Sequence, residues 1–163
     1  MVSYPLYKKM KPFPPTIILR HRKENLKKCS LRGLENRADM QFFTYPLEDT
    51  QLNLEPYVVL AVDAPPLTKE DGDKGIFLID GTWRYAEKML KSLKAPLNLR
   101  SLPQMSTAYP RRQDVEHGLA SIEALYLAYQ ILGRDTKGLL DQYHWKEEFL
   151  SNVERSFPLA HPL

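Results

Sequence analysis

The stretch that decides the fold is Ile76-Phe77-Leu78-Ile79-Asp80-Gly81-Thr82-Trp83, an apolar run that ends in an acid, a glycine and an aromatic residue. A continuous apolar run bounded by turn residues is typical of a strand that is covered on both faces. After it, apolar residues recur at helical spacing up to Pro96, at Ala86, Met89, Leu90 and Leu93. The segment therefore predicts a buried strand that leads directly into a helix.

Similar patterns extend outward from this segment. β-branched or apolar runs predict further strands at residues 16–19, 40–45 and 57–62, and a short one at 97–102. Residues 121–132, followed by Gly133, and residues 139–157, followed by Pro158, have the apolar stripes of amphipathic helices. Polar loops are expected at 21–39, with a helical turn, and at 106–117. The predicted fold class is α/β: a parallel or mixed sheet flanked by helices.

Length and composition indicate one folded domain. The chain has 163 residues, of which 43% are hydrophobic and 26% charged, a balance typical of a soluble protein. We expect residues 1–15, which include four prolines, to form an extended segment and residues 16–157 to form a single domain. A single cysteine, Cys29, excludes an intramolecular disulfide and favours a reducing, cytoplasmic location. Neither a membrane span nor a signal sequence is expected.

Positive charge is concentrated near the N-terminus. Residues 1–39 contain ten Lys and Arg against three Asp and Glu, a balance of +7, whereas the other 124 residues contain thirteen against seventeen, a balance of −4. Clustered cations gain free energy by displacing counterions from a polyanion such as RNA. A basic face that is only solvated explains the same composition, so both interpretations stay open.

Three segments contain residues whose side chains suit ligand binding or catalysis. Asp80 lies at the carboxyl end of a predicted strand, where open α/β sheets bind ligands, although an acid or Thr82 there also caps helices and Trp83 there also fits a core. Tyr109, expected to be exposed, and the adjacent Arg111 and Arg112 suit base stacking and phosphate contact; alternatively, they belong to a solvated loop in which Tyr109 is partly packed.

The other candidates favour structural roles. Glu123 in the first turn of its helix complements the helix dipole. Cys29 follows two lysines, but no partner base is evident, so an inert thiol is favoured over a nucleophile. The four histidines have no metal-ligand spacing, and no glycine-rich phosphate loop is present.

Taken together, these segments resemble a known superfamily. Asp80-Gly81-Thr82-Trp83 matches the Asp-x-Thr-Trp signature of the DTW-domain family, and residues 106–112 with 119–124 resemble its downstream Ser-x-Tyr-x-x-Arg and Ser/Thr-x-Glu-Ala elements. Residues 27–30 (Lys-Lys-Cys-Ser) and 144–150 are similar to the related small-subunit rRNA aminocarboxypropyltransferases. The resemblance covers roughly residues 16–155.

The resemblance implies a SPOUT-like domain with a C-terminal trefoil knot, which is a rare topology. It also implies an enzyme that binds S-adenosylmethionine and transfers its 3-amino-3-carboxypropyl group to a uridine-type nitrogen in rRNA or tRNA. Members that modify bacterial tRNA usually carry several N-terminal cysteines, whereas this chain has only Cys29. The N-terminal half therefore looks more like the ribosomal relatives.

The family motifs, together with the residues at the ends of the neighbouring predicted strands, indicate the roles of individual residues. Asp80 is the expected catalytic residue, as a base or as a positioning group. The expected cofactor-binding residues are Ser30, Val62, Asp63, Trp83, Leu102, Pro103, Ala120 and Ser121. The expected RNA-binding residues are Lys27, Lys28, Arg32, Tyr109, Arg111 and Arg112. No metal is expected. A SPOUT methyltransferase and a non-catalytic RNA-binding or ribosome-assembly protein remain as alternatives, and the oligomeric state is left open.

Overall fold

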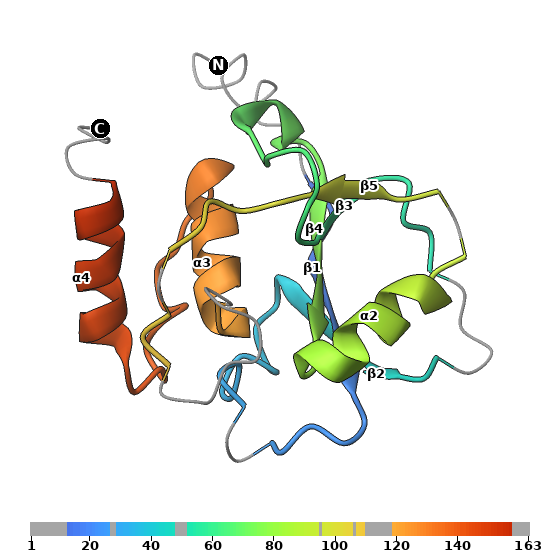
Figure 1. Ribbon diagram of the computed structural model, residues 1–163, viewed down its shortest axis with the longest axis horizontal. Helices are drawn as coiled ribbons and strands as arrows, with labels where there is room; N and C mark the ends of the chain where they lie inside the picture. Colours follow the sequence, from blue (N-terminus) through green and yellow to red (C-terminus); the bar gives the residue numbers. More distant parts are fainter. Residues whose placement is uncertain are drawn as a thin grey trace, which may run out of the picture.

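The structure is a computed structural model that describes residues 13–26, 29–47, 52–94, 96–105, 107–109 and 119–157, with the side chain of Trp83 excepted. Most of the predicted N-terminal extended segment and of the predicted loop 106–117 lies outside these residues. The described part contains a sheet with helices on both sides (Figure 1). None of its helices is long and apolar enough to span a membrane.

Five parallel strands form the sheet in the order β2-β1-β4-β3-β5. Their bounds are β1 Thr16–His21, β2 Met40–Tyr45, β3 Tyr57–Leu60, β4 Gly75–Asp80 and β5 Asn98–Arg100. The central strands β1 and β4 are buried over almost their whole length. This burial explains why their sequences are continuous apolar runs rather than alternating ones. The prediction of a parallel or mixed sheet is confirmed in its parallel form.

Side chains alternate between the two faces of the sheet and build two separate cores. On one face, Ile18 of β1 and Leu78 of β4 pack with α3 (Ser121–Ile131) and α4 (Lys146–Ser156). On the other face, Leu19 and Phe77 pack with α2 (Trp83–Ser92). Figure 1 shows α3 and α4 on one side of the sheet and α2 on the other, with α4 outermost.

The connections from β1 and β4 leave the sheet on opposite faces. Leu31 and Leu34, between β1 and β2, belong to the core that contains α3, whereas α2 carries the chain from β4 toward β5 on the other face. Right-handed crossovers that run in opposite directions require this arrangement. β1 and β4 are neighbours, so a crevice is expected beyond their carboxyl ends, at the topological switch point of the sheet.

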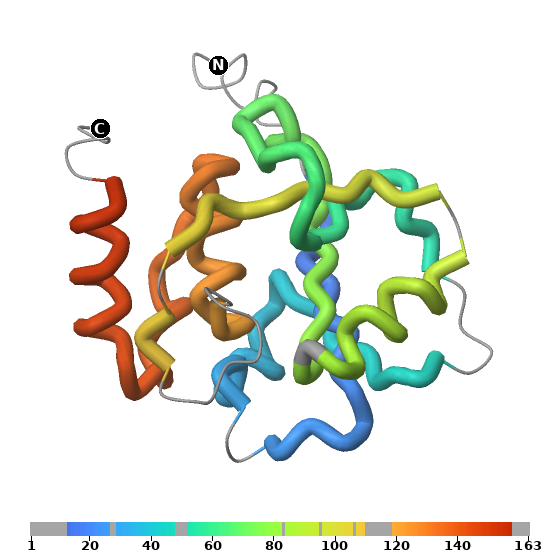
Figure 2. Tube along the Cα trace, in the orientation of Figure 1, coloured from blue at the N-terminus to red at the C-terminus, as the bar shows by residue number. Residues whose placement is uncertain are grey.

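After β5, the chain returns to the face covered by α3 and α4. Figure 2 follows this segment as it crosses from the α2 side of the sheet. There Met105 and Ala108 join the core around α3. The described residues after β5 therefore connect the last strand to the core on the α3 side of the sheet.

Two predicted element boundaries are wrong. Residues 139–145 form turns rather than the first part of the last helix, because bonds such as Tyr143 N–H to the Leu140 carbonyl close isolated turns. Leu139, Leu140 and Tyr143 are buried, and their spacing imitates a helix face. The third strand ends at Leu60, since Asp63 adopts a left-handed backbone (φ 54°) that breaks the extended run.

Candidate functional site

A buried ion pair lies at the carboxyl ends of β1 and β4. Arg20 and Asp80 are paired in the register of the two strands, and each follows the alternation that points Ile18 and Leu78 toward α3. They are 9% and 4% exposed. The switch point of the sheet thus contains two opposite charges on the α3 side, where the topology predicts a ligand crevice.

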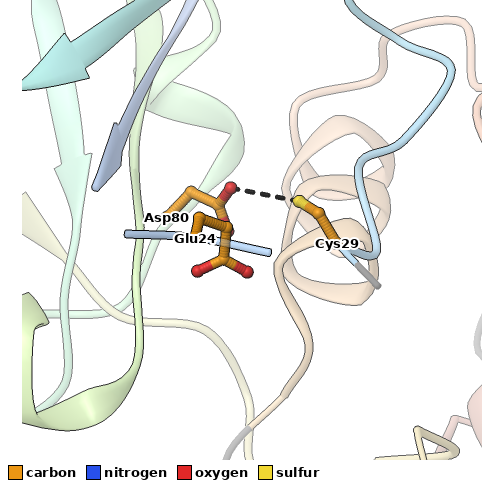
Figure 3. A group of neighbouring side chains, drawn as sticks. All are labelled: Glu24, Cys29 and Asp80. Atoms are coloured by element: carbon orange, nitrogen blue, oxygen red, sulfur yellow. Dashed lines mark hydrogen bonds between the residues drawn. The ribbon is translucent and has the colours of Figure 1, made fainter. Parts of the chain in front are cut away.

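Three donors surround the carboxylate of Asp80. Oδ2 accepts a hydrogen bond from Arg20 Nε at 3.2 Å and another from Cys29 Sγ at 3.3 Å, and Oδ1 accepts one from Ser121 Oγ at 2.7 Å. Figure 3 shows the bond between Asp80 and Cys29, with Glu24 beside it. The carboxylate is held by β1, by the loop that follows β1 and by the first residue of α3, so it has one fixed orientation.

Arg20 connects this carboxylate to a second acid. Its Nη2 donates to Glu35 Oε2 at 3.2 Å and to Cys29 Sγ at 3.4 Å, and its guanidinium lies over the Phe42 ring at 4.8 Å. Burial by itself lowers the pKa of Arg20, but the nearby Cys29, Asp80 and Glu35 outweigh it and raise that pKa above its ordinary value. Arg20 is therefore a permanent cation within the site.

Cys29 is a hydrogen-bonding residue rather than a nucleophile. Burial, followed by the charge of Asp80, raises the pKa of the thiol to about 12. The neutral thiol donates to Asp80 and accepts from the Leu31 N–H at 3.4 Å. The expectation of an inert Cys29 agrees with this environment, since a thiol with such a pKa supplies almost no thiolate near neutral pH.

Glu24, Cys29 and Asp80 place three potential metal ligands within 4.8 Å of one another. The sequence did not reveal this group because Asp80 is far from Glu24 and Cys29 in the chain. Arg20 already donates to both Asp80 and Cys29, and its charge repels a cation at the same atoms. A thiol with a pKa of about 12 is also a poor metal ligand. The donor set therefore suits the arginine better than a metal ion.

The start of α3 is fastened to the loop that follows β1. Ser30 Oγ accepts a hydrogen bond from the Ile122 N–H at 3.1 Å, and the adjacent Ser121 donates to Asp80. Ala120 immediately before the helix is buried. Of the predicted cofactor residues, Ser30, Ala120 and Ser121 thus lie together beside Asp80, and both hydroxyl groups bond to protein atoms in this structure.

Glu123 has a larger role than the dipole interaction expected from the sequence. Its fully buried carboxylate accepts four hydrogen bonds, from Thr107 Oγ1 (2.5 Å), Ala108 N–H (2.9 Å), Ala120 N–H (2.9 Å) and Tyr143 OH (2.9 Å). The donors come from both sides of the segment 110–118 and from the turn before α4. Glu123 therefore fixes the chain around the start of α3, next to Ser121 and Asp80.

A second group of predicted cofactor residues lies after β3 and β5. Ser101 N–H donates to the Pro65 carbonyl at 2.8 Å, and Ser101 Oγ donates to the Ala64 carbonyl at 2.7 Å. These bonds bring the segment with Val62 and Asp63 beside the segment with Leu102 and Pro103. Leu102 is half-buried, whereas Val62 is 78% exposed. Both segments lie at the same edge of the sheet as Asp80, because all five strands are parallel.

The structure places two of the six predicted RNA-binding residues. Arg32 is exposed on the loop after β1. Tyr109 is partly packed, as the alternative interpretation expected, rather than exposed: its ring is half-buried, lies parallel to Tyr143 with centroids 6.5 Å apart and packs against the core, because Glu123 bonds to the preceding residues Thr107 and Ala108. Lys27, Lys28, Arg111 and Arg112 lie outside the described residues. The side chain of Trp83, predicted to contact the cofactor, also lies outside them.

Comparison with known proteins gives a structural match. No protein-family model matches the sequence, and no curated protein matches it either. Among solved structures, one match is the SAM-dependent rRNA:acp-transferase Tsr3 from Vulcanisaeta distributa, with a TM-score of 0.68. The chain has the fold of Tsr3. The alignment covers 91% of this chain and 81% of the Tsr3 chain at 23% sequence identity, so the likeness establishes the fold.

Sequence reasoning found Asp80 but missed the residues that surround its charge. Arg20 and Glu35 were counted only as part of the basic N-terminal region and its few acids. One signal was available for Arg20: a charged residue at the end of the apolar run 16–19 is unusual in a strand that is buried on both faces. Its pairing with Asp80 depends on which strands are neighbours, and the order of strands is a tertiary property.

Proposed function

We propose that this protein transfers the 3-amino-3-carboxypropyl group of S-adenosylmethionine to a uridine-type nitrogen in RNA. The observation that carries the proposal is the shared fold with Tsr3, a SAM-dependent rRNA acp-transferase, combined with the fixed Asp80 at the switch point. Ligands of open parallel sheets bind at this position. The DTW-like segment around Asp80 lies there as well.

The charges of the site fit a cationic sulfonium compound. Among the described residues, Asp80 and Glu35 pair with Arg20, and a carboxylate oxygen of Glu24 lies within 4.8 Å of Asp80. The pKa of Glu35 is lowered, because hydrogen bonds from its own N–H and that of Gly33 and the charge of Arg20 outweigh its partial burial. At neutral pH Glu35 stays ionised, and a carboxylate near the bound cofactor would attract its positively charged sulfur.

Specific residues are proposed to hold the parts of S-adenosylmethionine. Ser30 holds the amino acid part, and the backbone around Asp63, Leu102 and Ala120 to Ser121 holds the adenosine. Trp83, Val62 and Pro103 complete this set as nonpolar neighbours. Support comes from the two groups of segments that the structure brings to one edge of the sheet.

S-adenosylmethionine supplies an electrophilic carbon attached to its positively charged sulfur. The uridine-type nitrogen forms a bond to the first carbon of the amino acid side, the bond from that carbon to sulfur breaks with its electron pair going to sulfur, and the nitrogen releases its proton to solvent. The protein selects this carbon over the methyl group by geometry, since the nitrogen must approach the attacked carbon in line with the bond from that carbon to sulfur. Leu102, Pro103 and the end of β3 are the proposed nonpolar walls for the methyl group.

Asp80 is proposed to position the base rather than to remove its proton outright. Three donors already occupy most of its acceptor positions. A carboxylate held in this way is a well-oriented acceptor. Its remaining acceptor position is proposed to receive the N–H of the target base and to align the nitrogen with the carbon.

The finer parts of the resemblance stay predictions. They are the DTW and SPOUT assignment, the C-terminal trefoil knot, a single domain over residues 16–157 and a cytoplasmic location. The absence of several N-terminal cysteines favours rRNA over tRNA as the substrate.

The proposal is tested with S-adenosylmethionine labelled in its carboxyl group and total RNA from cells that lack the protein. Transfer of the label to RNA, with a modified uridine identified by mass, is the expected result. Asp80→Asn, which keeps the shape of the side chain, is expected to reduce transfer at least a hundredfold, with little effect on cofactor binding by calorimetry. Asp73→Asn, an exposed acid before β4, serves as the matched control. A methylated product, or failure of the wild type to bind the cofactor, would refute the proposal.

A further inference from the structure

A second group of side chains lies on the opposite face of the same strand end. His21 follows Arg20 in β1 and therefore points to the face that carries α2. Its ring stacks on Tyr85 of α2, with centroids 3.9 Å apart and an angle of 11° between the planes, and lies 5.4 Å from the Tyr45 ring. His21 and Asp80 end neighbouring strands, so this aromatic group adjoins the site described above.

Gly81 joins the two groups. A Cβ atom at this position would lie 3.5 Å from His21 Cβ and 3.7 Å from Tyr85 Cβ. The residue directly after Asp80 is thus in close contact with the aromatic stack. If a nucleotide is held at Asp80, the adjacent nucleotides of the same RNA chain are within reach of this aromatic group.

Exposed cations surround the stack. Arg22 and Lys23 follow His21 in the chain, and Arg84 and Lys88 lie one helical turn apart on α2, on either side of Tyr85 in the sequence. Within the part of the chain that the structure describes, none of the four forms an ion pair. The nearest acid on α2, Glu87, is instead paired with Lys91 at 3.5 Å.

The state of His21 reflects this concentration of positive charge. Its Nδ1 accepts a hydrogen bond from the Lys23 N–H at 3.0 Å, which the protonated ring could not do. Burial first, and then the charges of Lys23, Arg22 and Lys88, lower the pKa of His21. Cations from the turn after β1 and from α2 thus act on the same point, and an anion bound there would relieve their mutual repulsion.

We propose that Arg22, Lys23, Arg84 and Lys88, arranged around the stacked rings of His21 and Tyr85, bind backbone phosphates of the substrate RNA beside the modified nucleotide. This inference rests on the proposed function for the identity of the polyanion. The surface, called the His21 surface below, differs from the predicted RNA contacts at Lys27, Lys28, Arg32, Tyr109, Arg111 and Arg112, none of which lies on α2.

The chemistry of the surface favours phosphates over bases as the groups that are contacted. Flexible lysine and arginine side chains around a neutral aromatic stack provide charge without a pattern of fixed donors and acceptors. Such contacts position a nucleic acid strand without reading its sequence. The His21 surface therefore contributes affinity and orientation, while selection of the nucleotide is left to the pocket at Asp80.

The test measures binding of a short fluorescein-labelled oligouridylate by fluorescence anisotropy over a range of salt concentrations. The double variant R84Q/K88Q is expected to bind about tenfold more weakly. The slope of the logarithm of affinity against the logarithm of salt concentration should be reduced by about 1.4, since each lost phosphate contact on a single strand removes about 0.7.

The control K69Q/K137Q removes the same charge from exposed positions. Lys69 precedes β4, and Lys137 bonds through its carbonyl to Arg37, which precedes β2. Both lie toward the opposite edge of the sheet, so this variant is expected to bind like the wild type.

The outcomes separate this inference from the proposed function. Equal affinity and equal salt slope for R84Q/K88Q and the wild type would overturn it, as would equal weakening of both double variants. If polyglutamate competes for binding to the wild type as well as oligouridylate does, and does not compete for binding to R84Q/K88Q, the assignment of the surface to RNA is overturned. If R84Q/K88Q loses RNA binding as expected while the wild type transfers no label from S-adenosylmethionine, the RNA surface stands and only the proposed reaction fails. Calorimetry with the cofactor alone, which should be unchanged in R84Q/K88Q, excludes a general structural effect.

Discussion

Replacement of Glu123 by glutamine tests whether its buried carboxylate holds the region around the start of α3. Each of its oxygens accepts from one hydroxyl and one backbone N–H: Thr107 and Ala120 at Oε1, Tyr143 and Ala108 at Oε2. In Glu123→Gln, one oxygen becomes an NH2 group. The hydroxyl beside that group can rotate and accept, but the backbone N–H cannot, so one buried donor always loses its acceptor.

The expected cost of E123Q follows from this count. A buried donor without a partner costs about 1–3 kcal/mol, and the remaining bonds lose the strength that the charge gave them. The neutral side chain is easier to bury, which offsets part of the loss. We expect a net loss of about 3 kcal/mol in the free energy of unfolding. With a urea m-value of about 2 kcal/mol per molar for a domain of this size, the unfolding midpoint falls by about 1.5 M.

The assay is urea unfolding followed by circular dichroism, with Tyr143→Phe for comparison. That variant removes one hydroxyl donor and leaves both backbone donors satisfied, so it should cost about 1–1.5 kcal/mol. A loss below 1 kcal/mol for E123Q, or a larger loss for Y143F than for E123Q, would refute this account of the bonding around Glu123.

Three further predictions follow from the ion pairs and the thiol. Arg20→Met should lower the free energy of unfolding by about 3 kcal/mol because Asp80 stays buried without its cation. In urea unfolding, the double variant R20M/D80N should lose less free energy of unfolding than the sum of the losses of the two single variants. Additive losses would disprove the coupling between Arg20 and Asp80. Cys29 should react with a thiol reagent at pH 8 far more slowly in the folded protein than in urea, since its pKa of about 12 and its burial both withhold the thiolate, and equal rates would contradict this. The hydrogen bond and charge of Arg37 lower the pKa of Asp39 against the effect of burial. The stabilisation from this pair is therefore present above the ordinary Asp pKa and is lost as the pH falls through the lowered value. The thermal unfolding temperature of Asp39→Asn should accordingly depend less on pH below about 4 than that of the wild type, and an unchanged pH dependence would count against this stabilisation.

The sequence predicted local structure well where burial left a continuous apolar pattern. The strands β1 and β4, the helix after Asp80 and the helix at 121–131 were recognised because their apolar residues follow the period of the element. The pattern failed at 139–145, since buried turn residues reproduced a helical spacing. It also predicted only a helix-dipole interaction for Glu123, because sequence alone does not show which distant N–H groups converge on a carboxylate.

What the sequence determined by itself is the α/β class, the position of Asp80 at the end of a buried strand and the excess of cations near the N-terminus. Tertiary structure decided which residues meet at that position. Arg20 joins Asp80, and His21 joins Tyr85, only because β1 lies next to β4 and because the connections from these strands cover opposite faces. Periodicity along a chain reports which side of an element is buried, whereas the order of strands depends on contacts between residues as far apart as 20 and 80, and a single sequence carries no local signal of them.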